Sequence, residues 1–139
     1  MEIKVKKLHP DAKLPWRGTA DAAGLDLYCT RSAVLAIGET AKLPTGLAME
    51  IPTGYCGVVY SRSSSAVSGL LITPLIVDAD YRGEIMVIVK NGTDGLFEVK
   101  AGSRIAQLRI EKLENAEFVW AEELSETARG TGGYGSTGR

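Results

Sequence analysis

The chain has 139 residues, which is enough for one domain with a substantial buried core. Its formal net charge is −1 at pH 7, so no overall field draws it to nucleic acid or to an anionic membrane, and any phosphate binding must come from a local cluster of donors. No stretch approaches the roughly 18 apolar residues of a membrane span, and the opening MEIKVKKLHP lacks the apolar run of a signal peptide, so we expect a protein that is not secreted but cytoplasmic, or nuclear in a eukaryotic host or virus.

Short strand patterns separated by turn signals dominate the first half of the chain. The opening E-I-K-V-K-K alternates polar and apolar residues, as a half-buried strand does. Pro44-Thr45-Gly46 and Pro52-Thr53-Gly54 are typical turn sequences between apolar runs. The strands expected here cover residues 2–7, 25–29, 33–37, 41–43, 47–51 and 57–60.

The second half continues this pattern around one short helix, expected over residues 63–68. The run E-I-M-V-I-V-K (84–90) is the strongest strand signal, because it is rich in branched residues and is followed by Asn91-Gly92. The other strands expected here cover residues 96–100, 104–112 and 116–120. Strands at intervals of about 8–12 residues with Gly and Pro between them predict an all-β fold: a sandwich, a barrel or a jelly roll.

The composition changes abruptly after Glu126, so we expect a β domain over residues 1–126 and a flexible glycine-rich arm over residues 127–139. The sequence RGTGGYGSTGR (129–139) cannot build a core, because Gly loses the most backbone entropy on ordering. Many such tails are simply disordered. This one also carries the groups that grip a polyphosphate, namely backbone N–H groups, hydroxyls and guanidinium groups, with Tyr134 as a flat face for a base.

Two polar segments of the first half are not required by the strand pattern. Asp26 interrupts the apolar run AGLDL, where alternation alone would place it on a solvent-facing side. SRSSSA (61–66) opens the expected helix. Its serines are ordinary N-cap residues, but a helix N-terminus beside Arg62 also suits an anion.

Two similar segments follow. The sequence DADYRGE (78–84) places two carboxylates and a tyrosine in a tight turn before the strongest strand, although turns favour Asp for conformational reasons alone. Gln107 interrupts the apolar run of GSRIAQL, and a buried amide needs hydrogen-bond partners. Each of the four segments is therefore a candidate binding element and has an ordinary structural explanation as well.

The cysteine and histidine content narrows the chemistry. Cys29 and Cys56 lack metal-binding spacing and are expected to be small buried thiols in a reducing compartment, with a disulfide between them left open. His9 is the only histidine and lies near the start of the chain, which disfavours a Ser-His-Asp or metal–histidine site.

Taken together, these segments resemble the homotrimeric deoxyuridine triphosphatases (dUTPases). Five motifs appear in the family's order: AGLDL (23–27), SRSSSA (61–66), IVDADYRGE (76–84), GSRIAQL (102–108) and RGTGGYGSTG (129–138). The segment PTGLAMEIPTGYCG (44–57) also resembles the family's scaffold. The resemblance implies a distorted jelly-roll or β-barrel-like domain that forms a homotrimer with shared active sites. It also implies Mg²⁺-dependent hydrolysis of dUTP to dUMP and pyrophosphate, which prevents uracil incorporation into DNA and supplies dUMP for dTMP synthesis. The expected partners are dUTP and the other subunits, with no stable nucleic-acid binding and no membrane.

The same resemblance implies roles for individual residues. Asp78 would orient and deprotonate the water that attacks the α-phosphorus, and Asp26 would hold Mg²⁺ through a water molecule. Tyr81 would lie against the deoxyribose and leave no room for a 2′-hydroxyl. The other implied substrate-binding residues are Arg62, Ser63, Ser64 and Gln107 at the phosphates, Arg129, Ser136 and Thr137 at the γ-phosphate, Tyr134 stacked on uracil, and Gly135 beside them.

One position departs from the family pattern. Leu75 stands where the family usually has Gly, three positions before the implied catalytic aspartate, in the hairpin whose backbone contacts uracil. A leucine cannot take the positive φ angles open to Gly, and it adds bulk where backbone should approach a base. The alternatives to a dUTP pyrophosphatase are a related dCTP deaminase or broader dNTP hydrolase, and a non-catalytic descendant that binds nucleotide or protein. The intact Asp78–Tyr81 segment argues against a deaminase.

Overall fold

Short strands make up nearly all of the regular structure in residues 1–134, the part of the chain that the computed structural model describes. The strands of the first half are β1 (Lys4–Lys7), β2 (Leu25–Tyr28), β3 (Ala33–Leu35), β4 (Thr40–Pro44), β5 (Leu47–Glu50) and β6 (Tyr55–Tyr60). Helix α1 (Ser63–Val67) is followed by β7 (Leu70–Ile72), β8 (Leu75–Val77), β9 (Met86–Asn91), β10 (Phe97–Val99) and β11 (Arg104–Lys112). The predicted all-β fold with one short helix is confirmed.

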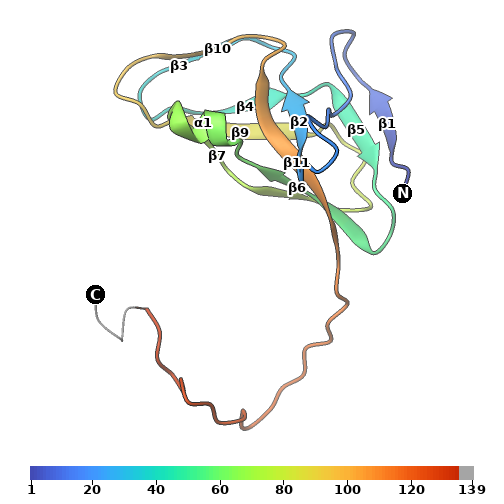
Figure 1. The fold of residues 1–139 in the computed structure, drawn as a ribbon, viewed down its shortest axis with the longest axis vertical. Coiled ribbons are helices and arrows are strands. Elements are labelled where there is room, and N and C mark those ends of the chain that lie inside the picture. Colours follow the sequence, from blue (N-terminus) through green and yellow to red (C-terminus); the bar gives the residue numbers. More distant parts are fainter. Residues whose placement is uncertain (135–139) are drawn as a thin grey trace.

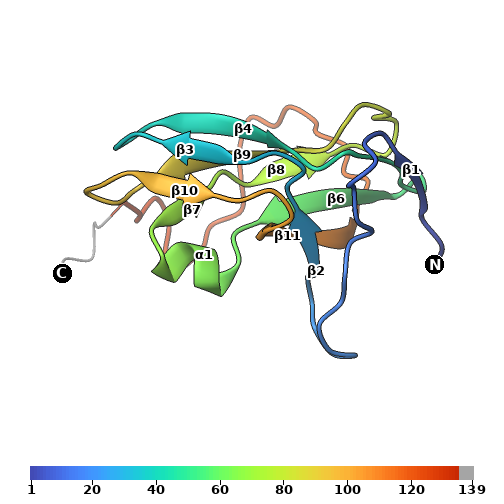
Figure 2. The same ribbon diagram turned by 90° about the horizontal axis from the view of Figure 1, so that it is seen from above.

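Two larger sheets form the body of the molecule. Their strand orders are β2-β11-β6-β8 and β4-β9-β7, and the remaining strands form the pairs β1–β5 and β3–β10. Strands β4 and β9 lie on one side of the molecule and β2, β6 and β11 on the other (Figure 2). A single buried core includes side chains from both sheets, among them Leu27, Val59 and Leu108 from the first and Leu43, Val87 and Val89 from the second. Each sheet thereby buries an apolar face, which is the usual basis of a two-sheet β fold.

The structure differs from the sequence prediction at two places. Strands β7 and β8 were not predicted, and they do not form the expected hairpin around Pro74, because β7 pairs with β9 and β8 pairs with β6. The predicted strand over residues 116–120 does not form: Phe118 is 95% exposed and Trp120 fully so. A strand needs a neighbour to pair with its backbone groups, and beyond Lys112 the described chain runs away from the body (Figure 1) without meeting one.

The cysteines behave as expected. Cys29 and Cys56 are both free and buried, and burial raises the pKa of both thiols. The possible disulfide is therefore absent. Residues 1–134 contain no helix long and apolar enough to cross a membrane. The predicted boundary after residue 126 stays a prediction.

Candidate active site

Asp26 lies at the centre of a charged cluster on the first sheet. It belongs to β2, where it pairs directly with Gln107 of β11. Its Oδ1 accepts a hydrogen bond from Arg62 Nε at 2.7 Å, and its Oδ2 accepts one from Arg104 Nη1 at 3.2 Å. Asp26 lies on the side of β2 opposite the buried Leu27, as alternation predicts, but the two arginines leave its side chain only 15% exposed. Two guanidinium groups fix this carboxylate in one orientation.

Arg62 comes from the start of helix α1. It occupies the N-cap position, and no side chain caps the helix, so the N-capping explanation of the serine run is not realised. Besides Asp26, Arg62 Nη1 donates to Ser64 Oγ at 3.0 Å and to the Arg104 carbonyl at 3.2 Å. Ser63 and Ser64 are exposed on the first turn, whereas Ser65 is buried and donates to the Ile105 carbonyl. The two exposed serines are thus placed where a ligand can reach them.

Gln107 completes this side of the cluster. Its Nε2 donates to the Ser61 carbonyl at 2.8 Å, which satisfies part of the amide. The side chain packs so closely on Gly24 that a Cβ there would overlap the amide group. The glycine in AGLDL therefore leaves the space that the Gln107 amide occupies on the neighbouring strand.

Arg104 is a site residue to which the sequence prediction assigned no role. Its guanidinium lies 5.8 Å from the centre of the Trp16 ring, and Trp16 bridges β2 through its backbone at Asp26. A register shift in β11 between Arg104 and Ala106 redirects this side chain, which simple alternation does not reveal. The sequence feature that could have indicated a role for Arg104 is its position in the GSRIAQL motif.

The charged cluster around Asp26 lines one hollow of about 390 Å³. Its charged side chains are Asp26, Arg62 and Arg104, so the arginines outnumber the carboxylate. Ser63 and Gln107 also line it. An excess of guanidinium groups with hydroxyl and amide groups nearby is suited to binding phosphate oxygens.

Asp78 lies in a tight turn directly after β8. The Tyr81 backbone N–H donates to the Asp78 carbonyl at 3.1 Å and closes the turn. Arg82 Nη1 donates to the Ala79 carbonyl at 2.6 Å. The Tyr81 hydroxyl donates to the Glu84 carbonyl at 3.0 Å, and a Cβ at Gly83 would overlap the tyrosine ring. Within residues 1–134, no hydrogen bond or ion pair involves the Asp78 carboxylate, which is left available for chemistry.

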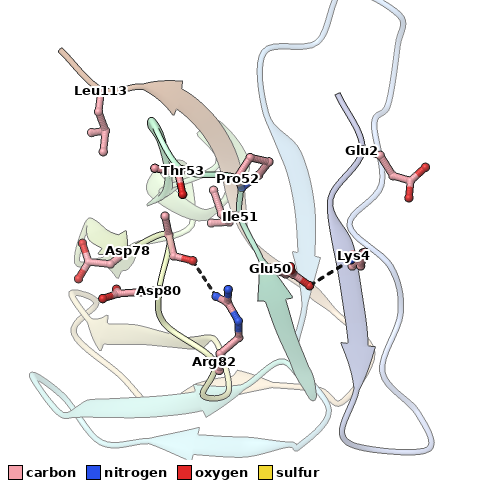
Figure 3. A pocket seen from close by; sticks show the side chains of 11 residues that line it. Glu2, Lys4, Glu50, Ile51, Pro52, Thr53, Asp78, Asp80, Arg82 and Leu113 are labelled. Atoms are coloured by element: carbon pink, nitrogen blue, oxygen red, sulfur yellow. Dashed lines mark hydrogen bonds and ion pairs between the residues drawn. The ribbon is translucent and has the colours of Figure 1, made fainter. Parts of the chain in front are cut away.

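The Asp78 turn separates two hollows of different character. The larger, about 780 Å³, has Asp78 and Asp80 on one side and Lys4 on the other (Figure 3). Glu50, which pairs with Lys4 at 3.5 Å, also lines it. The smaller, about 210 Å³, is mostly aliphatic and is lined by Leu75, Val77, Asp78, Tyr81, Ile85 and Met86, among others. Neither shares a lining residue with the Asp26 hollow.

The described part of the arm, residues 127–134, lines none of these hollows. Leu113 still lines the larger Asp78 hollow and donates its backbone N–H to the Gly54 carbonyl at 2.9 Å. Residues 114–134 form no strand or helix and extend away from the sheets (Figure 1). Arg129 Nε donates to the Gly132 carbonyl at 2.8 Å, and Tyr134 is fully exposed. The predicted residues Gly135, Ser136 and Thr137 lie outside the described residues. One chain thus brings Asp26, Arg62, Ser63, Ser64 and Gln107 together, but leaves Asp78, Leu75 and Tyr81 in a second group and Arg129 and Tyr134 in a third.

Comparison with known proteins establishes the family. The family model for dUTPase matches residues 10–138, which is nearly the whole chain. The chain belongs to the dUTPase family.

Relatives and solved structures agree with this assignment. The chain is 43% identical, over the full length of both proteins, to the deoxyuridine 5'-triphosphate nucleotidohydrolase of Nautilia profundicola. It is 44% identical to the enzyme of the same name from Wolinella succinogenes, with 100% of this chain and 95% of the relative covered. Among solved structures, a Staphylococcus bacteriophage 80alpha dUTPase variant with dUpNHpp has a TM-score of 0.93 at 29% identity, with 99% of each chain covered. A variant dUTPase of phage phi11 of S. aureus, whose structure concerns the coordination of a structural Mg(II) ion, has a TM-score of 0.85 at 25% identity and covers 91% of this chain and 100% of its own. The distorted jelly-roll expectation is thereby confirmed.

Proposed function

We propose that this chain hydrolyses dUTP to dUMP and pyrophosphate. The observation that carries the proposal is the full-length match to relatives named for dUTP hydrolysis, on a chain whose motifs build an anion-binding hollow and an accessible aspartate. The reaction removes dUTP before uracil enters DNA and supplies dUMP for dTMP synthesis. We propose that the protein acts in the cytoplasm, as expected for a chain with bacterial relatives.

Asp78 is the proposed general base. Its exposed and unpaired carboxylate accepts a proton from the attacking water, whose oxygen forms a bond to the α-phosphorus. The bond from that phosphorus to the bridging oxygen breaks, and pyrophosphate leaves with the electron pair. Positioned general-base assistance of this kind is typically worth ~10²–10⁴-fold in rate.

The Asp26 cluster is suited to Mg²⁺ that arrives with the triphosphate. Both Asp26 oxygens already accept hydrogen bonds from arginines, and residues 1–134 contain no group of three or more His, Cys, Asp or Glu side chains that could hold a metal. Asp26 would hold the ion through water rather than bind it directly, in keeping with the hydration that Mg²⁺ retains in proteins. When bound, Mg²⁺ neutralises charge on the phosphates. Arg62, Ser63, Ser64 and Gln107 bind phosphate oxygens, since the exposed serines and Arg62 meet at one turn.

The complete site forms between subunits of a homotrimer. The support for this is that the Asp26 hollow and the Asp78 turn share no lining residue, and that residues 114–134 line neither and run away from both (Figure 1). In the assembly, Arg129, Ser136 and Thr137 grip the γ-phosphate, Tyr134 stacks on the base and Gly135 allows close approach. Closure of the arm excludes water and aligns the reacting atoms.

The reaction is tested by following the oxygen of the attacking water. The purified chain is incubated with Mg²⁺ and dUTP in ¹⁸O-labelled water, and the products are analysed by mass spectrometry. Attack at the α-phosphorus places the label in dUMP. Label in pyrophosphate would show attack at the β-phosphorus and would contradict the proposed position of Asp78 beside the α-phosphorus. Parallel assays with UTP test the sugar contact of Tyr81, and release of ammonia from dCTP would indicate a deaminase.

The shared site is tested by subunit mixing. A chain carrying Asp78→Asn and a chain lacking residues 129–139 are each expected to have severely reduced activity alone. Co-refolded into mixed trimers, they regain activity if the arm of one subunit closes the site of another, because some sites then hold an intact Asp78 and an intact arm. Light scattering verifies that mixed trimers have formed. If their activity does not recover, the arm closes over the Asp78 of its own subunit.

A further inference from the structure

Trp16 lies in the loop before β2 and has no role in the proposed reaction. Two hydrogen bonds fix its backbone to β2: the Asp26 N–H donates to the Trp16 carbonyl at 2.7 Å, and the Trp16 N–H donates to the Asp26 carbonyl at 3.2 Å. The side chain is 48% exposed and lines the Asp26 hollow. A large aromatic ring is thus held at the wall of a hollow whose other lining residues are small or polar.

The Trp16 ring faces the guanidinium group of Arg104. The guanidinium carbon lies 5.8 Å from the centre of the ring, which is within the range of a cation–π contact. The loop also packs closely on the ring, since a Cβ at Gly18 would lie 3.3 Å from the ring atom Cζ3. The backbone hydrogen bonds and this packing together limit the positions open to the ring.

Arg104 has more unused donors than Arg62, the other arginine of the hollow. Nε and Nη1 of Arg62 donate three hydrogen bonds within the chain. Within residues 1–134, the Arg104 guanidinium donates one, from Nη1 to the Asp26 Oδ2 at 3.2 Å, although the group carries five N–H donors. The Arg104 side chain is also 45% exposed. Most of its N–H groups are therefore available to an oxyanion in the hollow.

We propose that Trp16 is a positioning residue for the triphosphate and that it acts through Arg104. The ring holds one face of the guanidinium and Asp26 holds Nη1, which leaves the other N–H groups for phosphate oxygens. A long side chain loses rotamer freedom when it binds an anion, and one that two contacts already hold loses less. Trp16 thereby raises the affinity for the triphosphate without contacting the reacting atoms. The inference rests on the proposed function, since it concerns the phosphates of the same nucleotide.

Binding of the non-hydrolysable analogue dUpNHpp with Mg²⁺ to the intact chain, measured by isothermal titration calorimetry, tests the inference. Trp16→Leu keeps an apolar side chain but removes the aromatic face, and we expect the affinity to fall ~3–30-fold, the range of a cation–π contact. Trp16→Phe keeps an aromatic face and is expected to stay within about threefold of the original chain. Arg104→Gln should lose ~10–100-fold, because it removes the charged donors themselves.

The double variant separates positioning from a general loss of structure. If Trp16 acts through Arg104, then Trp16→Leu should lower the affinity by no more than about twofold once Arg104 is already Gln, because the two effects are not independent. Losses that add in full in the double variant would overturn the inference.

Tyr28→Leu is the matched control. Lys13 Nζ lies 5.0 Å from the centre of the Tyr28 ring, so this variant also removes the aromatic partner of a cation from β2, but neither residue lines the hollow. We expect its affinity to stay within about twofold of the original chain. A loss equal to that of Trp16→Leu would oppose the inference.

The remaining outcomes separate the inference from the proposed function. An unchanged affinity in Trp16→Leu would overturn the inference and leave dUTP hydrolysis intact. Failure of the original chain to hydrolyse dUTP would instead contradict the proposed function. If circular dichroism shows that Trp16→Leu does not fold, Trp16→Met takes its place: a fall in affinity supports the inference, and an unchanged affinity opposes it.

Discussion

The two aspartates of the site are held in opposite ways. Asp26 is 15% exposed, pairs with Gln107 of the neighbouring strand β11 and forms ion pairs with Arg62 and Arg104. Asp78 is exposed in a turn at the end of an edge strand, and its carboxylate has no partner within residues 1–134. A carboxylate that is already paired with two cations is a poor proton acceptor but a stable positioning group. An unpaired one is free to take a proton from water. The contrast supports the proposal that Asp26 positions groups of the site and that Asp78 accepts the proton.

Substitution of the free aspartate should have the largest effect. Asp78→Asn keeps the shape of the turn, which is closed by backbone groups, but removes the proton acceptor. We expect turnover to fall by ~10²–10⁴-fold or more, with nucleotide affinity and melting temperature near those of the original chain. Asp80→Asn, in the same turn, is the charge-matched control and should affect turnover far less. Unchanged turnover in Asp78→Asn would mean that another group is the base.

Removal of the arm should rank next. A chain ending at Ala128 keeps every strand and the buried core, because the last strand ends at Lys112. We therefore expect a folded protein whose melting temperature changes little, and a fall in kcat/KM of roughly 10²-fold from lost alignment and lost exclusion of water. Circular dichroism and product assays on the same sample check both parts. Unfolding of the truncated chain would show that the arm is structural.

Substitution of the paired aspartate, Asp26, should mainly lower the stability of the fold. Asp26→Asn leaves two guanidinium groups without their carboxylate, and breaking a buried pair typically costs 3–5 kcal/mol. Because the Arg104 side chain is 45% exposed, we expect a loss of unfolding free energy of about 2–3 kcal/mol, measured by denaturant titration. Glu50→Gln, which breaks the exposed pair with Lys4, should cost less than about 1 kcal/mol. Equal losses in the two variants would show that the Asp26 pairs are no stronger than a surface contact.

The same contrast shows how far the sequence could go. The strand over residues 104–112 was predicted with the bounds that the structure has. Its irregularity was not predicted, because the register shift beside Arg104 buries two successive residues, Ile105 and Ala106, which a simple alternation does not reveal. The pairing of Asp26 with Arg62 could not be predicted locally, since these residues are 36 apart in sequence and meet only through the packing of α1 against the sheet. Strands β7 and β8 were missed because Pro74 interrupts one apolar run that the fold divides between two sheets. Residues 116–120 have a strand pattern without a partner strand in the described chain, and no local pattern shows that lack.

The smallest expected effect tests how tightly the paired region is packed. Gly24→Ala places a Cβ where the Gln107 amide lies, so that side chain must move and lose its hydrogen bond to the Ser61 carbonyl. A net hydrogen bond of this kind is worth about 0.5–1.5 kcal/mol, so we expect a loss of that size in stability and a fall in kcat/KM on the order of tenfold at most. Gly95→Ala, whose Cβ would meet nothing within 4 Å, is the control and should change neither quantity. If Gly24→Ala behaves like the control, the Asp26 region adapts to a change in its packing, and its difference from the Asp78 turn is then one of charge pairing alone.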